Sequence, residues 1–94
     1  MASFRLLPSA EADYEQAWYR GRSRQAAANF EVAVSVAVQN VSDAPERWPA
    51  IDKRHRFYAL RKFPYSIVYR IDPDEVVIVA VAHSRQMPYF FGRG

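Results

Sequence analysis

The stretch that decides the fold is residues 60–83, which read LRKFPYSIVYRIDPDEVVIVAVAH. Two runs of β-branched and aromatic residues, 65–71 and 76–83, flank a short segment containing Pro73, a residue that presets φ for a tight turn. This pattern predicts an antiparallel hairpin. The second run is apolar at every position from Val76 to Ala82, so both of its faces should be covered. We therefore predict that it is the central strand of a sheet.

A strand and a helix are expected at the start of the chain. Residues 4–7 predict a short strand that Pro8 closes. Ser9 is then a candidate N-cap for a first helix, and Gly21 is its expected end. The apolar residues of this helix recur at helical spacing and predict one buried stripe, formed by Ala10, Tyr14, Ala17 and Trp18.

Residues 23–42 contain neither Gly nor Pro, and two periodicities compete in them. One is helical and would bury Ala27, Phe30, Val34, Ala37, Val38 and Val41; the other alternates as in a strand through Val32, Val34, Val36 and Val38. Strands seldom run this far, and the three consecutive alanines near the start favour a helix. We predict a second helix that forms a hairpin with the first.

The segments around the hairpin are expected to be less regular. Residues 44–49 predict a loop, because two prolines exclude a helix interior and a central strand, and Trp48 is expected to fold back onto the helices. Residues 55–63 predict a third strand, at the edge of the sheet. The tail, residues 84–94, contains one proline and two glycines and is expected to be irregular.

These elements together predict the fold class. We expect an α+β domain with the order β-α-α-β-β-β, in which a helical hairpin packs on one face of a mostly antiparallel four-stranded sheet. The other face of the sheet is expected to be left free for function. With 94 residues, no internal repeat and no linker, the chain is expected to be a single domain, 1–94.

Composition narrows the class of protein. The chain has no cysteine, which excludes a disulfide framework and suits the cytoplasm, where we expect the protein to act. It has no secretion signal and no run of roughly 18 apolar residues, so no membrane partner is expected. Two histidines and three glycines do not suggest a metal site or a phosphate-binding loop. We therefore expect no metal and no small-molecule cofactor.

The charge is distributed unevenly along the chain. Residues 1–47 carry five Arg against six acids, net −1, whereas residues 48–94 carry eight Lys or Arg against four acids, net +4. Most of the excess lies in Lys53, Arg54, Arg56, Arg61, Lys62 and Arg70. Each of these taken singly is an ordinary solvated side chain, but together they favour an acidic partner, either a protein segment or a nucleic acid.

Several segments carry a family resemblance. They are residues 45–49 (PERWP), 61–70 (RKFPYSIVYR) and 79–85 (VAVAHSR), with a paired aromatic, Trp18-Tyr19, late in the first predicted helix. Over nearly its whole length the chain resembles the RelE/ParE superfamily of bacterial toxins. The resemblance implies one RelE/ParE-like toxin domain with the fold predicted above, and a toxin of a type II toxin–antitoxin module, historically described as plasmid stabilisation.

The resemblance also implies a partner and one of two activities. The partner is a cognate antitoxin, the product of a neighbouring gene, which wraps around the toxin and buries its active surface. RelE-like members cleave messenger RNA on the ribosome, whereas ParE-like members poison DNA gyrase. The target is therefore either gyrase or the ribosome.

Residues that RelE-like members use for RNA cleavage are replaced here. Such members place an Arg on the third strand, another Arg just after the last strand, and a Tyr in the tail. Carried onto this chain, the three positions fall on Ser66, on or beside Ser84, and on Phe90. Serine cannot supply the charge of a guanidinium, and phenylalanine has no phenol for proton transfer. We therefore predict a ParE-like protein that is not an enzyme.

Were the chain a nuclease, its remaining catalytic candidates would be His83, Arg85, Arg61 and Tyr89. His83 ends the central strand and could be a general base if Arg85 faced the same cleft. We favour the simpler interpretation that His83 caps the strand by hydrogen bonding to backbone groups. Strand alternation should place His83 on the same face as Val79 and Val81.

Two surfaces are expected to bind the antitoxin or the target. One is a basic strand with Arg54, Arg56, Arg61 and Lys62, among which Arg61 is the best candidate for an acidic contact because it lies between apolar strand residues. The other is the tail, with His83, Arg85, Tyr89, Phe90 and Phe91.

The leading hypothesis is a toxin that inhibits gyrase by protein binding and is neutralised by its antitoxin. One alternative is a RelE-like, ribosome-dependent mRNA endonuclease with a substituted active site. Another is a non-toxic relative that only binds its partner, or binds DNA in a repressor complex.

Overall fold

The predicted hairpin is the centre of the sheet. In the computed structural model, which describes residues 3–20 and 23–91, β3 (Tyr65–Ile71) and β4 (Glu75–His83) pair antiparallel. The turn between them closes where the backbone N–H of Asp72 donates to the carbonyl of Glu75 at 2.9 Å. The hairpin prediction is confirmed.

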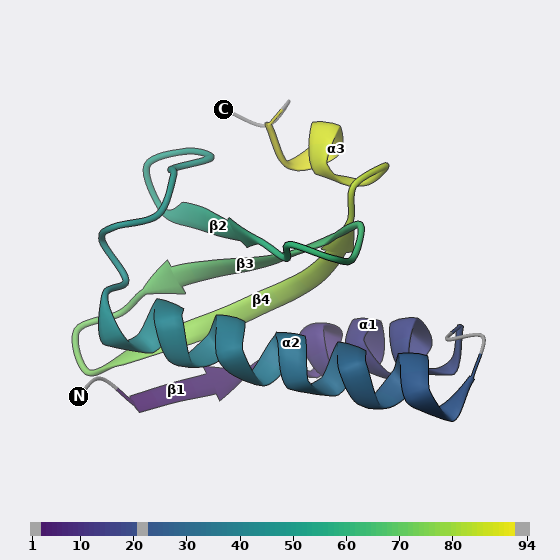
Figure 1. The fold of residues 1–94 in the computed structure, drawn as a ribbon. Coiled ribbons are helices and arrows are strands. Elements are labelled where there is room, and N and C mark those ends of the chain that lie inside the picture. The colour runs from purple at the N-terminus through teal and green to yellow at the C-terminus, as the bar shows by residue number, and fades with distance from the viewer. Residues whose placement is uncertain (1–2, 21–22, 92–94) are drawn as a thin grey trace.

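Two further strands flank the hairpin and complete a four-stranded sheet of order β1-β4-β3-β2 (Figure 1). β1 (Ser3–Leu6) runs parallel to β4, and β2 (His55–Ala59) pairs antiparallel with β3 at the outer edge. β4 is therefore central, as predicted. β2 is shorter than the strand predicted for residues 55–63, because residues 60–64 form the turn that leads into β3.

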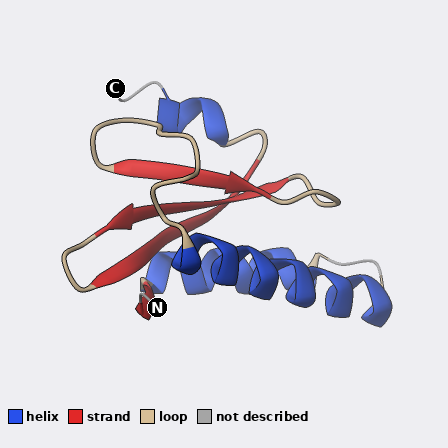
Figure 2. Ribbon diagram, turned by 60° about the vertical axis from the view of Figure 1, so that its left-hand side comes forward, coloured by secondary structure: helices blue, strands red, loops and turns tan. Residues whose placement is uncertain are grey.

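Two helices cover one face of the sheet, α1 (Pro8–Tyr19) and α2 (Arg24–Asp43) (Figure 2). The helical interpretation of residues 23–42 is confirmed, and the competing strand pattern was wrong. Ser23 is the N-cap of α2, and its hydroxyl accepts the N–H of Ala26 at 3.1 Å. All six residues expected on its buried face are buried: Ala27, Phe30, Val34, Ala37, Val38 and Val41.

The first helix differs from its prediction in two details. Its N-cap is Leu7 and Pro8 is already helical, because the first helical position needs no backbone N–H. The Ser9 hydroxyl instead donates to the carbonyl of Val79 at 2.9 Å. Trp18 is 37% exposed, so the buried part of the stripe consists of Ala10 and Ala17. The expected end of this helix, Gly21, lies outside the described residues.

The main core lies between the helices and the sheet. Its side chains include Ile67, Tyr69 and Ile78 from the sheet. Phe30 of α2 joins three segments there, because its ring stacks on that of Tyr14 and meets the rings of Phe63 and Tyr65 edge-on, at centroid distances of 5.7, 5.3 and 5.4 Å. Such aromatic contacts add to the stabilisation that burial alone provides.

The opposite face of the sheet is also covered, contrary to prediction. The tail is not irregular throughout but forms a short helix, α3 (Met87–Phe91), on this side of the sheet (Figure 1). Pro88 is tolerated near its start, where a backbone N–H is not needed. Met87 is buried in a second cluster with Val68, Ala80 and Ala82. The small alanines leave room for the methionine, so little of this face is left bare.

A β-bulge in the central hairpin overturns part of the alternation expected for β4. The register shifts between Val68 and Tyr69, whose partners are Ala80 and Ile78, so Val79 is the extra residue. Val79 packs in the second cluster and Val81 in the main core. The prediction that both valines share a face with His83 was therefore wrong for Val79.

The loop after α2 is tied to the sheet by buried side chains. Tyr69 is fully buried, and its hydroxyl donates to the carbonyl of Pro45. Trp48 donates from Nε1 to the carbonyl of Asn40 at 3.5 Å, and its ring meets that of Tyr58 at 4.6 Å. Trp48 thus contacts α2 as predicted. Within the described residues, no helix is both long enough and apolar enough to cross a membrane.

The buried phenol of Tyr69 generates the first prediction. Tyr69→Phe leaves the Pro45 carbonyl without its donor and should lower the free energy of unfolding by about 1–2 kcal/mol. Burial raises the pKa of Tyr69 to about 12. The neutral phenol is therefore favoured in the folded state, and its contribution is complete below about pH 10 and lost as the pH rises towards 12. Urea unfolding in this range should show a shallower alkaline loss for Tyr69→Phe than for the wild type, and equal slopes would contradict the assignment.

Candidate functional site

A pocket of about 210 Å³ lies where the end of β4 meets α1. It brings together two of the residues that the sequence singled out, His83 and Arg85. Its full lining is Asp13, Gln16, Ala17, Arg20, Tyr65, Val81, His83, Arg85 and Gln86. The pocket thus combines basic, acidic and amide side chains from α1, from both central strands and from the turn before α3.

His83 is held at the strand end by hydrogen bonds to the following turn. Its Nδ1 accepts the backbone N–H of Arg85 at 3.1 Å, and its own backbone N–H donates to Oε1 of Gln86 at 2.9 Å. Because a backbone N–H can only donate, the neutral ring must carry its proton on Nε2. The ring then has no free lone pair for a general base. This geometry is that of the strand-capping interpretation.

Side chains of α1 complete the free edge of β4. β1 pairs with β4 only as far as Ile78. Beyond it, Ser9 donates to the carbonyl of Val79, and the carboxylate of Asp13 accepts the N–H of Val81 at 3.2 Å. Burial raises the pKa of Asp13, and the hydrogen bond from Val81 opposes that shift. This role is not predicted from the sequence, because polar residues four apart beside apolar ones are also typical of the solvated edge of a helix.

The predicted basic strand is not one surface. Arg56 is half-buried, and its Nη1 donates to the carbonyls of Glu46 and Trp48 at 3.2 and 2.7 Å, so it holds the loop after α2. Arg54 precedes β2, whereas Arg61 and Lys62 follow it. The five residues of β2 separate the two ends by roughly 15 Å. Arg61 lies exposed in a turn, so its predicted place between apolar strand residues was wrong.

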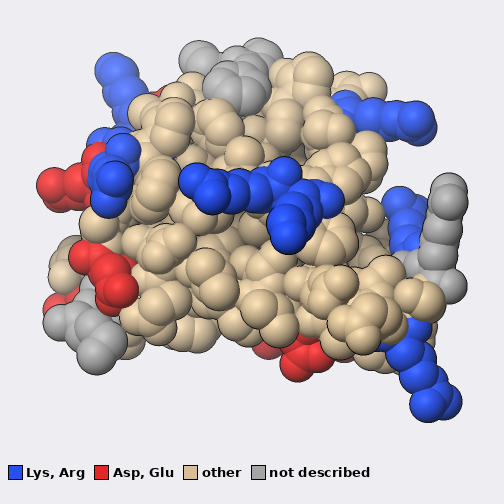
Figure 3. Space-filling model, viewed as in Figure 1, with Lys and Arg blue, Asp and Glu red and all other residues tan. Residues whose placement is uncertain are grey.

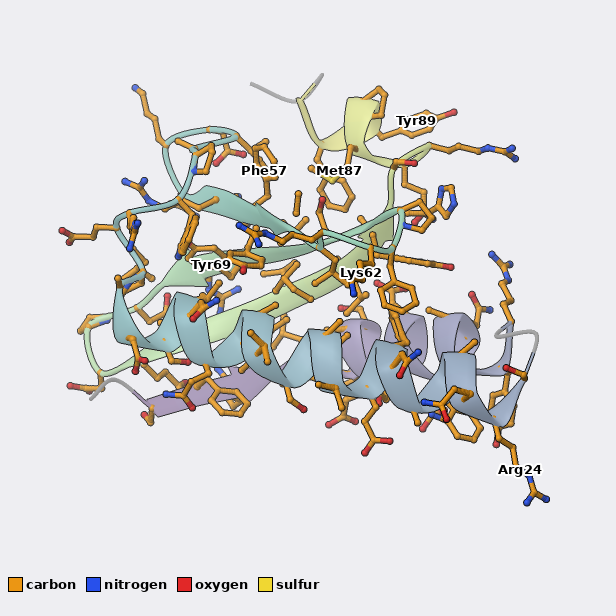
Figure 4. The ribbon with its side chains drawn as sticks, viewed as in Figure 1. Arg24, Phe57, Lys62, Tyr69, Met87 and Tyr89 are labelled. Atoms are coloured by element: carbon orange, nitrogen blue, oxygen red, sulfur yellow. The ribbon has the colours of Figure 1, made fainter. Side chains whose placement is uncertain are left out.

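An apolar groove of about 550 Å³ lies beside Arg61 and Lys62, between α2 and the turn from β2 to β3. Val32 and Val36 of α2 line it and are 62% and 51% exposed. Figure 3 shows this face as largely uncharged, with basic side chains near its middle, where Figure 4 labels Lys62 in the same view. The remaining lining residues are Asn29, Ala33, Tyr58, Leu60, Arg61, Lys62 and Phe63.

The second pocket rich in charge lies at the other end of β2. It measures about 460 Å³ and includes His55, which was not predicted to be a site residue. Nδ1 of His55 lies 3.1 Å from Oδ1 of Asp52. The two residues are three apart in the sequence with two cations between them, and this spacing was the sequence signal for a charged site here.

Among the tail side chains that the structure describes, Tyr89 is the exposed aromatic one. Tyr89 is 75% exposed, whereas Phe90 is half-buried against the second cluster. The side chain of Phe91 lies outside what the structure describes. In Figure 4, Met87 points into the molecule and Tyr89 points away from it. Arg85 is exposed at the mouth of the first pocket.

The positions at which RelE-like members carry catalytic groups are also placed. Ser66 is buried in β3, opposite Ala59 and Ala82, and Ser84 is exposed in the turn after β4. Within residues 3–20 and 23–91, no three His, Cys, Asp or Glu side chains come together as a metal site would require.

Comparison with known proteins connects this geometry to a family. The family model described as "ParE toxin of type II toxin-antitoxin system, parDE" matches residues 4–88. Among solved structures, a chain titled "Chromosomal ParDE TA system from P. aeruginosa" aligns with a TM-score of 0.65 and 19% identity. The alignment covers 88% of this chain and 96% of that one, and it speaks for a shared fold. Among curated proteins, no relative matches.

Asp13 provides a test of the edge contact on β4. Asp13→Asn keeps an oxygen acceptor for the Val81 N–H and removes a half-buried charge, so it should be at least as stable as the wild type at neutral pH. Asp13→Leu leaves that N–H unpaired and should cost about 1–3 kcal/mol.

The pH dependence has a definite sign. Because the folded-state pKa of Asp13 is raised above 3.8, its contribution is complete below that value and is lost as the pH rises through the folded pKa. Urea unfolding of the wild type and of Asp13→Asn between about pH 3 and 7 should therefore show that the advantage of the variant in free energy of unfolding grows with pH. An advantage that shrinks as the pH rises would contradict this account.

Proposed function

Because this chain belongs to the ParE toxin family of type II toxin–antitoxin systems, we propose that it inhibits DNA gyrase by binding the enzyme in the cytoplasm. In the same proposal a cognate antitoxin, encoded beside it, binds the toxin and neutralises it. No bond is made or broken by the toxin itself. It acts by binding another macromolecule through an exposed surface.

The observation that carries the proposal is that Ser66 and Phe90 occupy positions where RNA cleavage would need a cation and a proton donor. Ser66 is buried in β3, and Phe90 packs against the second cluster. RNA cleavage through the 2′-hydroxyl requires groups that move protons and cations that stabilise charge on phosphorus. The lone pair of His83 is already occupied by a backbone N–H. These facts support a protein-binding toxin over the endonuclease alternative.

The tail supplies the surface that we assign to gyrase. Tyr89 exposes three quarters of its surface on α3, and Arg85 stands exposed in the preceding turn. Met87 and Phe90 fasten this helix to the sheet, so the tyrosine is presented on an ordered support. Exposed tyrosine and arginine are the residue types that dominate binding energy in protein interfaces.

The apolar groove beside α2 supplies the surface that we assign to the antitoxin. A contiguous exposed apolar surface marks an interaction site, whereas single apolar residues do not, and here Val32 and Val36 line one groove. Arg61 and Lys62 stand on its rim, with no ion-pair partner among the described residues. An amphipathic segment with acidic residues along one side would satisfy both features.

Inhibition of gyrase is the direct test. Purified toxin should block supercoiling and accumulate cleaved DNA. Tyr89→Ala should raise the concentration needed for half-inhibition by about tenfold or more, as expected for loss of a central interface tyrosine. Tyr19→Ala, which removes an equally exposed tyrosine from the end of α1, is the matched control and should act like the wild type.

Three outcomes would contradict the gyrase assignment. Gyrase that is unaffected by excess toxin would remove it. Cleavage of messenger RNA in a translation extract, lost on His83→Ala, would establish the endonuclease alternative. Expression without growth arrest, in the absence of antitoxin, would favour the non-toxic alternative.

The antitoxin groove is tested with the neighbouring gene product. Val36→Glu places a carboxylate in the apolar groove and should weaken antitoxin binding by more than tenfold, because the charge would have to be desolvated in the complex. Calorimetric titration measures this loss. Ser35→Glu adds the same charge one position earlier on α2, outside the groove lining, and should bind normally. Equal affinities for the two variants would exclude this groove as the antitoxin site.

A further inference from the structure

The pocket at the start of β2 has an unusual lining for a protein-binding site. Ile71 is its one apolar residue, and the other lining residues are Asp52, Lys53, Arg54, His55, Arg56, Arg70 and Asp72. Four cations face two acids there, a net charge of +2 with histidine neutral. Protein interfaces depend on apolar and aromatic anchors, whereas nucleic-acid interfaces are polar and positively charged.

Both carboxylates of this pocket are already engaged inside the chain. Oδ1 of Asp52 accepts the backbone N–H groups of Arg54 and His55 at 2.7 and 2.8 Å, and the carboxylate also lies beside the ring of His55. The hydrogen bond from Arg54 is the main cause that lowers the pKa of Asp52. Asp72 receives Nε and Nη2 of Arg70 at 3.2 and 3.5 Å. Arg70 offsets the charge of Asp72, whereas Asp52 keeps its negative charge, so the net charge of +2 already counts the repulsion from both acids.

The four cations are not equivalent. Arg56 is committed to two backbone carbonyls and Arg70 to Asp72. The side chains of Lys53 and Arg54 are exposed and make no hydrogen bond or ion pair with the part of the chain that the structure describes. Their backbone is nevertheless fixed, because Asp52 ties the loop through the N–H groups of Arg54 and His55. The loop thus presents two adjacent free cations on a pre-formed turn.

We propose that this pocket binds the phosphodiester backbone of duplex DNA, with Lys53 and Arg54 as the phosphate ligands. Ammonium and guanidinium groups donate charge-assisted hydrogen bonds to phosphate oxygens, and such contacts depend on charge rather than on base sequence. The site goes beyond the proposed function, and the two are compatible because gyrase itself acts on DNA. The antitoxin groove, at the far end of β2, remains open while the pocket is filled.

Direct binding of DNA tests the site without gyrase. The full chain is titrated into a fluorescently labelled duplex of about 20 base pairs at about 50 mM salt, and anisotropy is recorded. The double variant Lys53→Ala/Arg54→Ala should bind about tenfold more weakly than the wild type. The slope of log affinity against log salt should fall by about two, one for each lost phosphate contact. Circular dichroism of the variant should match the wild type, since both side chains are exposed.

The matched control removes the same charge from the other end of the strand. Arg61→Ala/Lys62→Ala lowers the net charge by the same amount but leaves the lining of the pocket unchanged. If the pocket is the site, this variant should therefore retain the affinity and salt slope of the wild type. Equal losses in the two double variants would mean that only net charge matters and would overturn the proposal. So would unchanged binding in Lys53→Ala/Arg54→Ala. A single-stranded RNA of the same length is the second probe, and tighter binding of RNA through Lys53 and Arg54 would overturn the assignment to duplex DNA.

The failure of this site is distinguishable from failure of the proposed function. Inhibition of supercoiling with unchanged DNA affinity in Lys53→Ala/Arg54→Ala would reject the pocket and leave the gyrase assignment standing. Loss of DNA affinity in that variant, with gyrase unaffected by the wild type, would support the pocket and reject the gyrase assignment.

Discussion

The structure depends on satisfying the backbone of β4, a strand that is buried along most of its length but only partly paired on one edge. β3 covers one edge throughout, whereas β1 covers the other only to Ile78. Buried amides and carbonyls need partners, so the rest of that edge must be completed by side chains. Ser9 and Asp13 reach it from α1, and Gln86 reaches it from the turn before α3. These contacts tie α1 and the turn before α3 to the sheet.

The same requirement explains the pocket beside His83 and its limits as a catalytic site. Asp13, His83 and Gln86 meet there because each supplies or receives a hydrogen bond at the open end of β4. Groups engaged in this way stabilise the fold and have little freedom for proton transfer. Function is therefore better sought where side chains are exposed on ordered supports: Tyr89 on α3, Val36 on α2, and the turn that carries Lys53 and Arg54.

Charge that is clustered in the sequence is separated in space. Arg54, Arg56, Arg61 and Lys62 were expected on one basic strand, but β2 covers only His55–Ala59 and the chain bends after it. Arg54 and Arg61 consequently lie in surroundings of opposite character, one a polar pocket and the other the rim of an apolar groove. Arg56, midway, is used to hold the loop after α2. Two different partners are thus better matched to this stretch than one.

The amino-acid sequence by itself determined the hairpin, the central place of β4 and the buried face of α2, because these follow from local apolar periodicity and a proline turn. Only the tertiary structure decided the rest. The bulge at Val79 belongs to the register of two strands, and α3 is positioned by the packing of Met87 and Phe90. Ser9, Asp13 and Arg56 pair with backbone groups that other segments leave open. No local pattern encodes these contacts, since the sequence around a polar side chain is the same whether its partner is water or a strand edge about seventy residues away.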